Sequence, residues 1–327
     1  MRKLVTVRKI ANIFPIPDAD LIERAQVDGW NVVVKKGEFA PGDVCVYGEI
    51  DSVFPQWDER FAFLEGKRLK TKKMRGVVSQ GIAFPISILG AGDFAVGDDV
   101  TDFLGVVKYE PPAPKDVSIK GEFPWFVSKT DAERVQNLVE ELQTYQNRTA
   151  YVTEKLDGSS ITIFCREFES IWQTGVCSRN FELKLDAENQ FVSAVKRLGV
   201  LEKLLEFCQA NNRSLALQGE LIGAGVQGNK YQVAATDIRF FSVYDIAANG
   251  KTAFVDFARI IAALGLQTVP ILQTDYLLHT DIERYLNEAE GKSRLNEKTE
   301  REGIVFRTTE SDFDFKAISN RFLLKND

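Results

Sequence analysis

Residues 151–164 read Tyr-Val-Thr-Glu-Lys-Leu-Asp-Gly-Ser-Ser-Ile-Thr-Ile-Phe, and Lys155, Asp157 and Gly158 interrupt two strand-like segments. The β-branched and aromatic residues on both sides favour strands, and the glycine favours a turn. A lysine two residues before an aspartate and a glycine suits an amine that attacks the α-phosphorus of a nucleotide. Because Lys-x-Asp-Gly occurs by chance in about one chain of this length in fifteen, the rest of the sequence must decide.

Composition narrows the class of protein. The chain has 327 residues, 44% of them hydrophobic, and a net charge of −6. This length allows about two globular domains. We expect a cytoplasmic protein with no membrane partner, because there is no long apolar run and the Met-Arg-Lys start leads into a strand-like segment. The cysteines lack Cys-x-x-Cys spacing, which predicts buried, reduced thiols and neither a zinc site nor disulfides: Cys45, Cys165, Cys177 and Cys208.

The single histidine limits the possible chemistry. His279 precedes a helix expected to begin near Thr280, and we predict that it is a solvent-exposed structural residue. This disfavours Ser-His-Asp and Cys-His hydrolases and three-histidine metal sites. Lysine chemistry and carboxylate-bound magnesium stay open.

The first 108 residues have the pattern of a small β-domain. Strand-like segments at 4–13, 30–35, 44–50 and 77–84 are separated by Asp-Gly, Pro-Gly-Asp and glycine-rich turns, which predicts a small closed barrel. Arg-Gly-Val-Val-Ser-Gln-Gly at 75–81 resembles a strand start of OB-fold nucleic-acid-binding domains. We therefore expect an OB-like barrel over residues 1–108 and a proline-rich, extended linker over residues 109–123.

A basic segment lies within this barrel. Six positive charges occur without an intervening acid, at Lys67, Arg68, Lys70, Lys72, Lys73 and Arg75. Such a segment can contact nucleic-acid phosphates independently of base sequence. A solvated hairpin whose lysines discourage edge-to-edge strand pairing explains the same charges. Both interpretations stay open.

Residues 124–327 mix helix and strand patterns without regular βαβ alternation, which predicts an α+β domain of mainly antiparallel sheets with flanking helices. A capping residue, early acids and spaced apolar residues predict an amphipathic helix from Thr130 to Leu142. A second helix is expected over residues 186–210, with a break near Gly199. We expect 151–155 to pair with 159–165, and further strands at 214–221, 239–246 and 302–308.

Groups suited to nucleotidyl transfer follow Lys155 in order. Such a site needs side chains for the sugar and base, carboxylates for a divalent metal and cations for the phosphates. The candidates are Arg179 in Cys-Ser-Arg-Asn, Glu220 in Gly-Glu-Leu-Ile-Gly, Phe241 in Phe-Phe-Ser-Val-Tyr, Glu302 in Glu-Gly-Ile-Val-Phe, and Lys316 in Phe-Asp-Phe-Lys-Ala-Ile. Each alone fits a rim carboxylate, core aromatic or surface lysine, but the ordered set favours a site.

This order resembles the covalent nucleotidyltransferase superfamily of ATP-dependent DNA ligases, RNA ligases and messenger-RNA capping enzymes, over about residues 124–325. The resemblance implies a nucleotidyltransferase (ATP-grasp-like) domain over residues 124–327. ATP-type DNA ligases and capping enzymes place an OB domain after the lysine strand, whereas eleven residues follow Lys316 here. An OB-like domain in front, together with Lys-Thr-Asp-x-x-Arg-x-Gln at 129–136, resembles RNA ligases that seal RNA 3′-OH ends.

The resemblance also implies roles. Lys155 would carry AMP, and Lys316 would contact the α-phosphate. Asp157, Glu220 and Glu302 would hold Mg²⁺ or Mn²⁺. The nucleotide-binding candidates are Glu154, Arg179, Glu220, Phe241, Glu302, Arg134 and Gln136. Magnesium, Lys316 and partial burial would favour the neutral amine of Lys155. The substrates would be ATP and RNA with 3′-OH and 5′-phosphate ends, in a nicked duplex or a stem-loop break, as in RNA repair, with no protein partner evident.

One departure and two alternatives remain. Many RNA ligases carry a second lysine two positions after the first in the last strand, where this chain has Ile318; Arg307 and Lys325 are candidate replacements. A DNA-sealing or capping-type nucleotidyltransferase is the first alternative. The second is a non-catalytic nucleic-acid-binding protein on a ligase scaffold.

Overall fold

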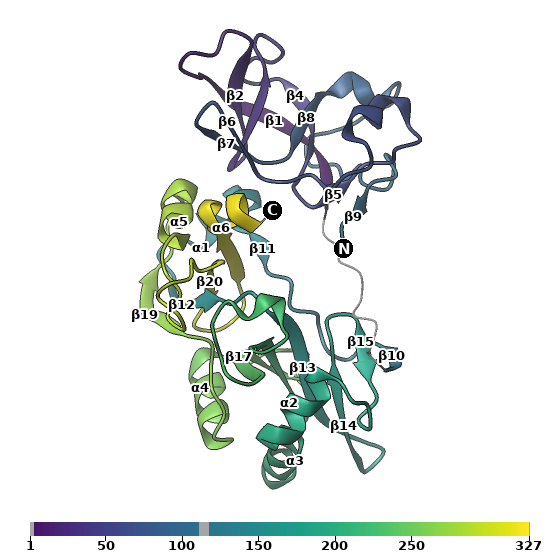
Figure 1. The fold of residues 1–327 in the computed structure, drawn as a ribbon, viewed down its shortest axis with the longest axis vertical. Helices are drawn as coiled ribbons and strands as arrows, with labels where there is room; N and C mark the ends of the chain where they lie inside the picture. The colour runs from purple at the N-terminus through teal and green to yellow at the C-terminus, as the bar shows by residue number, and fades with distance from the viewer. Residues whose placement is uncertain (1–2, 111–117, 327) are drawn as a thin grey trace. The chain divides into compact units, whose positions relative to one another are not determined.

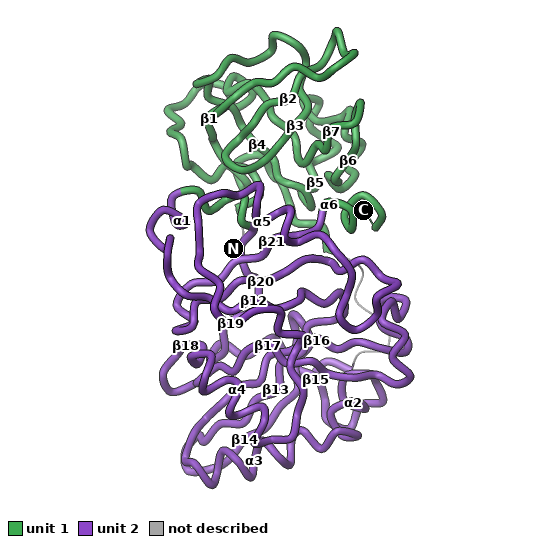
Figure 2. Tube along the Cα trace, turned by 90° about the vertical axis from the view of Figure 1, so that its left-hand side faces the viewer, with its two compact units in different colours: residues 1–112, 135–139, 320–327 green, residues 113–134, 140–319 purple. Residues whose placement is uncertain are grey.

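The computed structural model describes residues 3–110 and 118–326, so part of the predicted linker lies outside the described residues. The chain forms two compact units, coloured separately in Figure 2. Unit 1 comprises residues 1–112, 135–139 and 320–327, and unit 2 comprises residues 113–134 and 140–319. The domain limits at 1–108, 109–123 and 124–327 stay a prediction.

Unit 1 is built on a five-stranded antiparallel sheet in the order β3-β2-β1-β4-β8. Strands β1, β2, β4 and β8 are labelled in Figure 1. β1 pairs first with β4 and then, around a register shift between Ile10 and Asn12, with β2. The edge strand β3 meets the segment just before the other edge strand, β8, because the backbone N–H of Gln80 donates to the Asn31 carbonyl in β3 at 2.8 Å. The predicted barrel is therefore present, with strands β1 (Val5–Pro15), β2 (Ile22–Val27), β3 (Trp30–Lys35), β4 (Val44–Gly48) and β8 (Ile82–Pro85).

Short elements complete unit 1, and one strand differs from the prediction. The segment 77–84 forms two strands, because the chain turns at Gly81, which has φ +77° and no room for a side chain beside the Gly48 carbonyl. The core contains Val5, Val46 and three clustered phenylalanines. The short elements are β5 (Ser52–Val53), η1 (Glu59–Leu64), β6 (Lys72–Met74), β7 (Val77–Ser79), η2 (Ile86–Leu89), β9 (Val107–Lys108), η3 (Val135–Asn137) and α6 (Asn320–Asn326).

Unit 2 contains a seven-stranded antiparallel sheet and a five-stranded mixed sheet. The first has the order β10 (Ile119–Glu122), β15 (Phe181–Leu183), β14 (Ile171–Cys177), β13 (Ser159–Phe168), β16 (Leu215–Ile222), β17 (Asp237–Asp245) and β18 (Gly250–Lys251). The second has the order β11 (Glu133–Arg134), β21 (Asp314–Ile318), β20 (Gly303–Thr308), β12 (Thr149–Lys155) and β19 (Ile271–Leu277). Only β11, which lies parallel to β21, departs from antiparallel pairing among the described strands of these two sheets. The predicted α+β class is confirmed.

Helices cover these sheets and bury a large apolar core. Val195 of α2 and Leu204 of α3 pack with Ile163 and Leu217 of the seven-stranded sheet. The predicted break at Gly199 is confirmed, since its φ of 62° ends α2 just before α3 begins. The helices of unit 2 are α1 (Val139–Tyr145), whose first residue is grouped with unit 1, α2 (Gln190–Leu198), α3 (Val200–Asn211), α4 (Phe254–Ala263) and α5 (Ile282–Ala289), with the short η4 (Gln227–Asn229).

Two predicted elements near the site are wrong. The helix expected from Thr130 begins only at Val139, because Glu133 and Arg134 instead pair with Phe315 and Lys316 of β21. The strands 151–155 and 159–165 do not pair with each other: β12 pairs with β19 and β20, whereas β13 pairs with β14 and β16. The Lys-x-Asp-Gly segment therefore connects two sheets.

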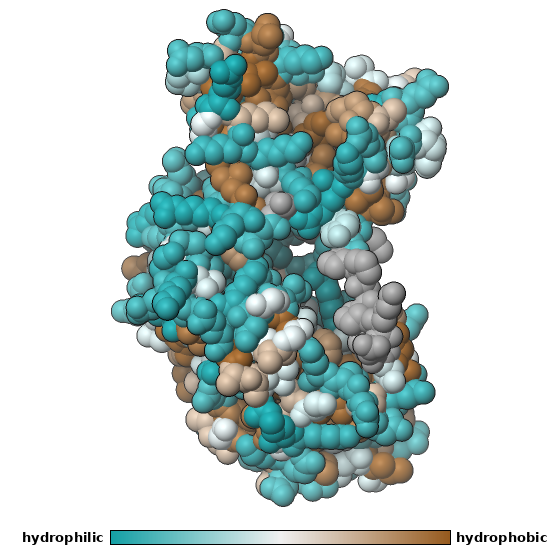
Figure 3. All heavy atoms as spheres, viewed as in Figure 1, coloured by the Kyte–Doolittle hydropathy of each residue, from teal (hydrophilic) through white to brown (hydrophobic). Residues whose placement is uncertain are grey.

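The surface and the cysteines agree with the composition. Figure 3 shows hydrophilic residues over much of the visible surface. Within residues 3–110 and 118–326, no helix combines the length and apolar character needed to cross a membrane. The four cysteines are buried and free, as predicted.

Candidate active site

Lys155 lies where the two sheets of unit 2 are joined. β12 ends at Lys155 and β13 begins at Ser159 (Figure 1). A Cβ atom on Gly158 would lie 2.3 Å from the Leu221 carbonyl oxygen in β16, so only glycine fits this turn. The backbone N–H of Gly158 donates to Glu220 Oε1 at 3.1 Å. The turn therefore places the lysine beside the acidic end of β16.

The Lys155 amine is held by carboxylates. Its Nζ donates to both oxygens of Glu302, at 2.7 Å each. Burial lowers the pKa of Lys155, but Glu302 and Glu220 oppose burial strongly enough that the pKa lies above its ordinary value. The expectation of a neutral amine is therefore not met by the protein's own side chains, because two acids face the lysine.

Burial and the nearness of other acids raise the pKa values of Glu220 and Glu302 in this cluster. Burial raises the pKa of Glu220 to about 8, with Lys155 opposing the shift and Glu302 and Asp157 adding to it. Burial also raises the pKa of Glu302, against the effect of Lys155. Closely spaced acids in a partly buried site are stabilised by cations, so the cluster favours a positively charged ligand.

The donor chemistry fits a divalent cation, because Asp157, Glu220 and Glu302 supply the oxygen ligands that Mg²⁺ and Mn²⁺ prefer. Two of these acids, however, are paired with lysines: Glu302 with Lys155 and Asp157 with Lys230. Consistent with this pairing, no group of three or more His, Cys, Asp or Glu side chains in the described part of the chain has the spacing of a metal site. The three ligand assignments stay a prediction.

Two predicted phosphate-binding cations contact one acid, and a third lies beside one of them. Lys316 in β21 donates to Asp131 Oδ1 at 2.8 Å, and Arg179 donates to Asp131 Oδ2 at 3.2 Å. Arg134 is the β11 residue directly opposite Lys316. Burial lowers the pKa of Lys316 to about 8 against the opposing effect of Asp131, and Arg134 and Lys155 lower it further. The structure thus brings three predicted cations together.

Phe241 lies beside the Lys155 turn. It is the extra residue at a register shift between β16 and β17, and such bulges redirect side chains next to functional sites. The half-buried ring packs against the apolar cluster that contains Leu156 and Tyr231. The Arg307 guanidinium lies 5.4 Å from the ring centroid, and Arg307 also donates to Thr153 at 3.0 Å. Arg307 therefore supports the ring, and its role as a replacement for the second lysine stays a prediction.

Two further predicted residues, Glu154 and Gln136, are buried. Glu154 is buried, and its Oε2 accepts from the Arg294 backbone N–H at 2.8 Å, while burial raises its pKa. Gln136 is buried in η3, and its backbone carbonyl accepts from the Gly29 N–H at 3.0 Å within unit 1. Ile318 is buried in β21. A nucleotide contact by Glu154 or Gln136 stays a prediction.

Three polar residues at this site were not predicted. Asp131 bridges Lys316 and Arg179; Lys230 pairs with Asp157; and Tyr231 Oη accepts from the Asp157 N–H at 2.6 Å. One feature of the sequence could have indicated Asp131 as a site residue, namely its place in the Lys-Thr-Asp-x-x-Arg-x-Gln segment at 129–136. Lys230 and Tyr231 lie in a polar loop whose sequence carries no comparable signal.

The basic segment of unit 1 is largely exposed. Lys72 and Lys73 lie in β6, and Arg75 forms the β6–β7 turn with a φ of 46°. Arg68 is less exposed than the other basic residues, because it pairs with Asp51 at 3.5 Å and its guanidinium lies 4.9 Å from the Tyr109 ring centroid. The exposed members are Lys67, Lys70, Lys72, Lys73 and Arg75.

The single histidine and the hollow near it have structural explanations. His279 stacks on Tyr285 with centroids 3.9 Å apart, so its predicted structural role holds, but it is half-buried instead of exposed.

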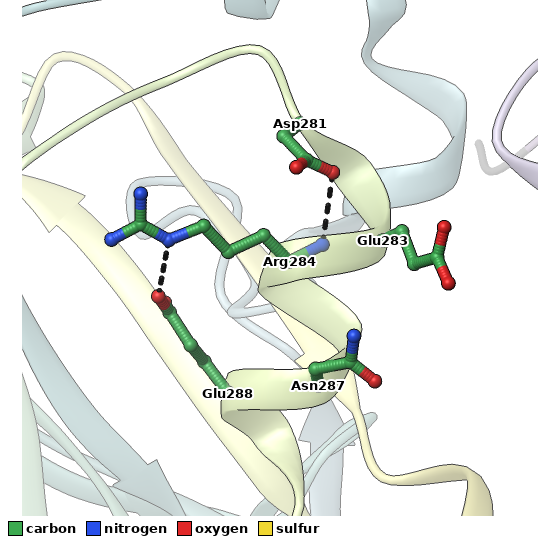
Figure 4. A pocket seen from close by; sticks show the side chains of 5 residues that line it. All are labelled: Asp281, Glu283, Arg284, Asn287 and Glu288. Carbon is green, nitrogen blue, oxygen red and sulfur yellow. Dashed lines mark hydrogen bonds and ion pairs between the residues drawn. The ribbon is translucent and has the colours of Figure 1, made fainter.

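The hollow beside α5, about 460 Å³, is lined by side chains that leave the helix on opposite sides (Figure 4). Arg284 is paired with Glu288 at 2.8 Å and contacts the Asp281 cap. This hollow contains none of the predicted site residues.

Comparisons with known proteins now place the chain. A family model described as an OB-fold domain matches residues 4–86, and one described as RNA ligase matches residues 148–325, more than half of the chain. The chain belongs to the RNA ligase family. This ligase carries Lys155, Glu220, Glu302 and Lys316 within the matched segment. A comparison with curated proteins finds no match.

Solved structures of the RNA ligase of Naegleria gruberi resemble this ligase over nearly its full length. A variant with AMP and manganese is 40% identical, with a TM-score of 0.91, and 99% of each chain is covered. A variant with ATP and manganese gives the same values. The enzyme with pyrophosphate is 41% identical, with a TM-score of 0.90, covering 100% of this chain and 99% of that one. The predicted fold, an OB domain followed by a nucleotidyltransferase domain, is confirmed.

Proposed function

We propose that this ATP-dependent RNA ligase joins an RNA 3′-OH to a 5′-phosphate and carries AMP on Lys155. One observation supports the nucleophile above all: the Lys155 amine lies between the two sheets and donates to both oxygens of Glu302. The ATP, AMP, manganese and pyrophosphate in the Naegleria structures fit the same assignment.

The reaction has three phosphoryl-transfer steps. Lys155 loses a proton and its nitrogen bonds to the α-phosphorus of ATP, while the bond from that phosphorus to the bridging oxygen breaks and pyrophosphate leaves. The oxygen of an RNA 5′-phosphate then displaces the lysine and takes the AMP. Finally the RNA 3′-OH attacks the 5′-phosphate, loses its proton, and releases AMP as the phosphodiester forms.

The protein's charges assist the first step. Glu302 is hydrogen-bonded to the Lys155 amine, and burial raises its pKa, so it is placed to accept the lysine proton. A divalent cation near Asp157, Glu220 and Glu302 would neutralise phosphate charge and favour the neutral amine. Lys316 would bind the α-phosphate, and Phe241 would stack on adenine. Arg179 and Arg134 would bind the ribose or the remaining phosphates.

The exposed lysines at 67–75 are proposed to contact the RNA backbone, in a protein that repairs RNA breaks in the cytoplasm. Single cationic contacts of this type give affinity without base specificity. Nicked duplexes and stem-loop breaks both present the required 3′-OH and 5′-phosphate ends.

The proposal is tested with purified protein, ATP and Mg²⁺ or Mn²⁺ on matched 3′-OH/5′-phosphate RNA nicks and stem-loop breaks. We expect sealing of at least one of these substrates, and loss of sealing when the 5′-phosphate is absent. Equal sealing of a nick with an all-DNA 3′ strand would favour a DNA ligase. Reaction with GTP in place of ATP would favour a capping-type enzyme, and no sealing of any break would contradict ligation.

A further inference from the structure

Asp131 bridges the two cations that are proposed to bind phosphate. Its Oδ1 accepts from Lys316 at 2.8 Å and its Oδ2 from Arg179 at 3.2 Å. Each carboxylate oxygen thus holds a different cation, as two oxygens of one phosphate group do. The Asp131 side chain is 41% exposed, whereas Lys316 is 12% exposed. The acid is therefore open to solvent, whereas the lysine is largely covered.

The backbone fixes this arrangement. Two residues after Asp131, Glu133 pairs with Phe315, and Arg134 pairs with Lys316 in the parallel β11–β21 ladder. The ladder sets the distance between Asp131 and Lys316, while the aspartate side chain keeps its own rotamers. A rotation about its side-chain bonds would move the carboxylate away from both cations.

We propose that Asp131 is a positioning residue that takes the place of a phosphate between Lys316 and Arg179 and is displaced when pyrophosphate or the ATP phosphates bind. This inference rests on the proposed phosphate roles of the two cations. Two anions cannot share the same pair of cations without repulsion, so the carboxylate must move away as phosphate enters.

The test measures the binding of pyrophosphate alone by calorimetry at about pH 6.5, where Lys316 is charged. We expect Asp131→Asn to bind pyrophosphate about fivefold more tightly than the wild type, the size of effect expected from removing a partly exposed competing ion pair. Asp131→Ala, which also removes the charge, is expected to change in the same direction. The matched control is Asp312→Asn, whose carboxylate pairs with Arg148 at 2.7 Å, and it is expected to leave binding unchanged.

A pH series separates positioning from mere structural support. Four charged groups face Lys316. Asp131 raises the pKa of Lys316, Arg134 and Lys155 lower it, and the fourth group is Glu302, whose own pKa Lys316 lowers. The advantage of Asp131→Asn over wild type should therefore shrink as the pH rises from about 6.5 to about 8, because the variant's lysine loses its proton first. Unchanged or weaker binding by both Asp131 variants at pH 6.5 would overturn the inference. If Lys316→Ala binds pyrophosphate as well as wild type, the proposed phosphate role of Lys316 fails instead.

Discussion

The raised pKa of Glu220 makes the stability of the folded protein depend on pH. Its pKa is about 8 in the folded protein because of burial, far above the ordinary value of 4.5. The folded state therefore binds more protons than the unfolded state between these values. Its contribution to stability is fully present below pH 4.5 and is lost as the pH rises through about 8.

Glu220→Gln mimics the protonated carboxyl. We expect it to raise the free energy of unfolding at about pH 9 by about 2 kcal/mol relative to wild type, with little change near pH 5. Urea unfolding at the two pH values measures this, and the exposed Glu310→Gln serves as the control. Equal unfolding free energies for Glu220→Gln and wild type at about pH 9 would show that the pKa of Glu220 is not raised in the folded protein.

At the residue scale, the ordered motifs anticipated the residues that gather around Lys155, because each motif carries its chemistry in local sequence. Glu220, Glu302 and Lys316 all contact this cluster or lie beside it. Asp131 could not be anticipated in the same way, since its partner Lys316 lies 185 positions away. The raised pKa of Lys155 also depends on neighbours that only the fold assembles.

The turn between β12 and β13 depends on Gly158. A Cβ atom there would lie 2.3 Å from the Leu221 carbonyl oxygen and 2.9 Å from Glu220 Cγ. We expect Gly158→Ala to lower the free energy of unfolding by about 2 kcal/mol and to reduce adenylylation of Lys155 at least tenfold. Thermal unfolding and labelling with ATP measure the two effects. Gly121→Ala in β10, with no atom within 4 Å, is the control; matching behaviour of the two variants would contradict the expectation.

Pairing between distant segments explains the wrong elements. The apolar spacing after Thr130 is real, since Val135, Leu138 and Leu142 are buried, but they are divided between η3, the following residue and α1. Residues 133–134 join a strand whose partner lies far along the chain. Likewise, two strands around a glycine turn resemble a hairpin locally, although here they belong to different sheets.

At the scale of the molecule, variants of the β6–β7 hairpin test whether unit 1 binds RNA while unit 2 carries out the adenylylation of Lys155. We expect the combined replacement of Lys70, Lys72, Lys73 and Arg75 by Gln to leave adenylylation of Lys155 unchanged while weakening RNA binding. The log–log salt slope should fall by about 3, because four cations no longer release phosphate counterions. The control replaces four other exposed lysines of unit 1 by Gln: Lys3, Lys9, Lys35 and Lys36. An equal fall in slope for both sets would favour a merely solvated hairpin.

The order of domains could be predicted because turn-rich strand patterns and ordered motifs occupy separate parts of the chain. Their limits could not be fixed, because residues 135–139 and 320–327 are grouped with unit 1 although they lie far from it in sequence. Such grouping depends on packing, which sequence periodicity does not report.

The covalent role of Lys155 is tested most directly by incubating the protein with α-labelled ATP and Mg²⁺ and isolating it under denaturing conditions. Wild type and the exposed control Lys298→Ala are expected to carry an acid-labile label, with pyrophosphate released in equal amount. Lys155→Ala is expected to carry none. Label that persists on folded Lys155→Ala would contradict the assignment of the nucleophile.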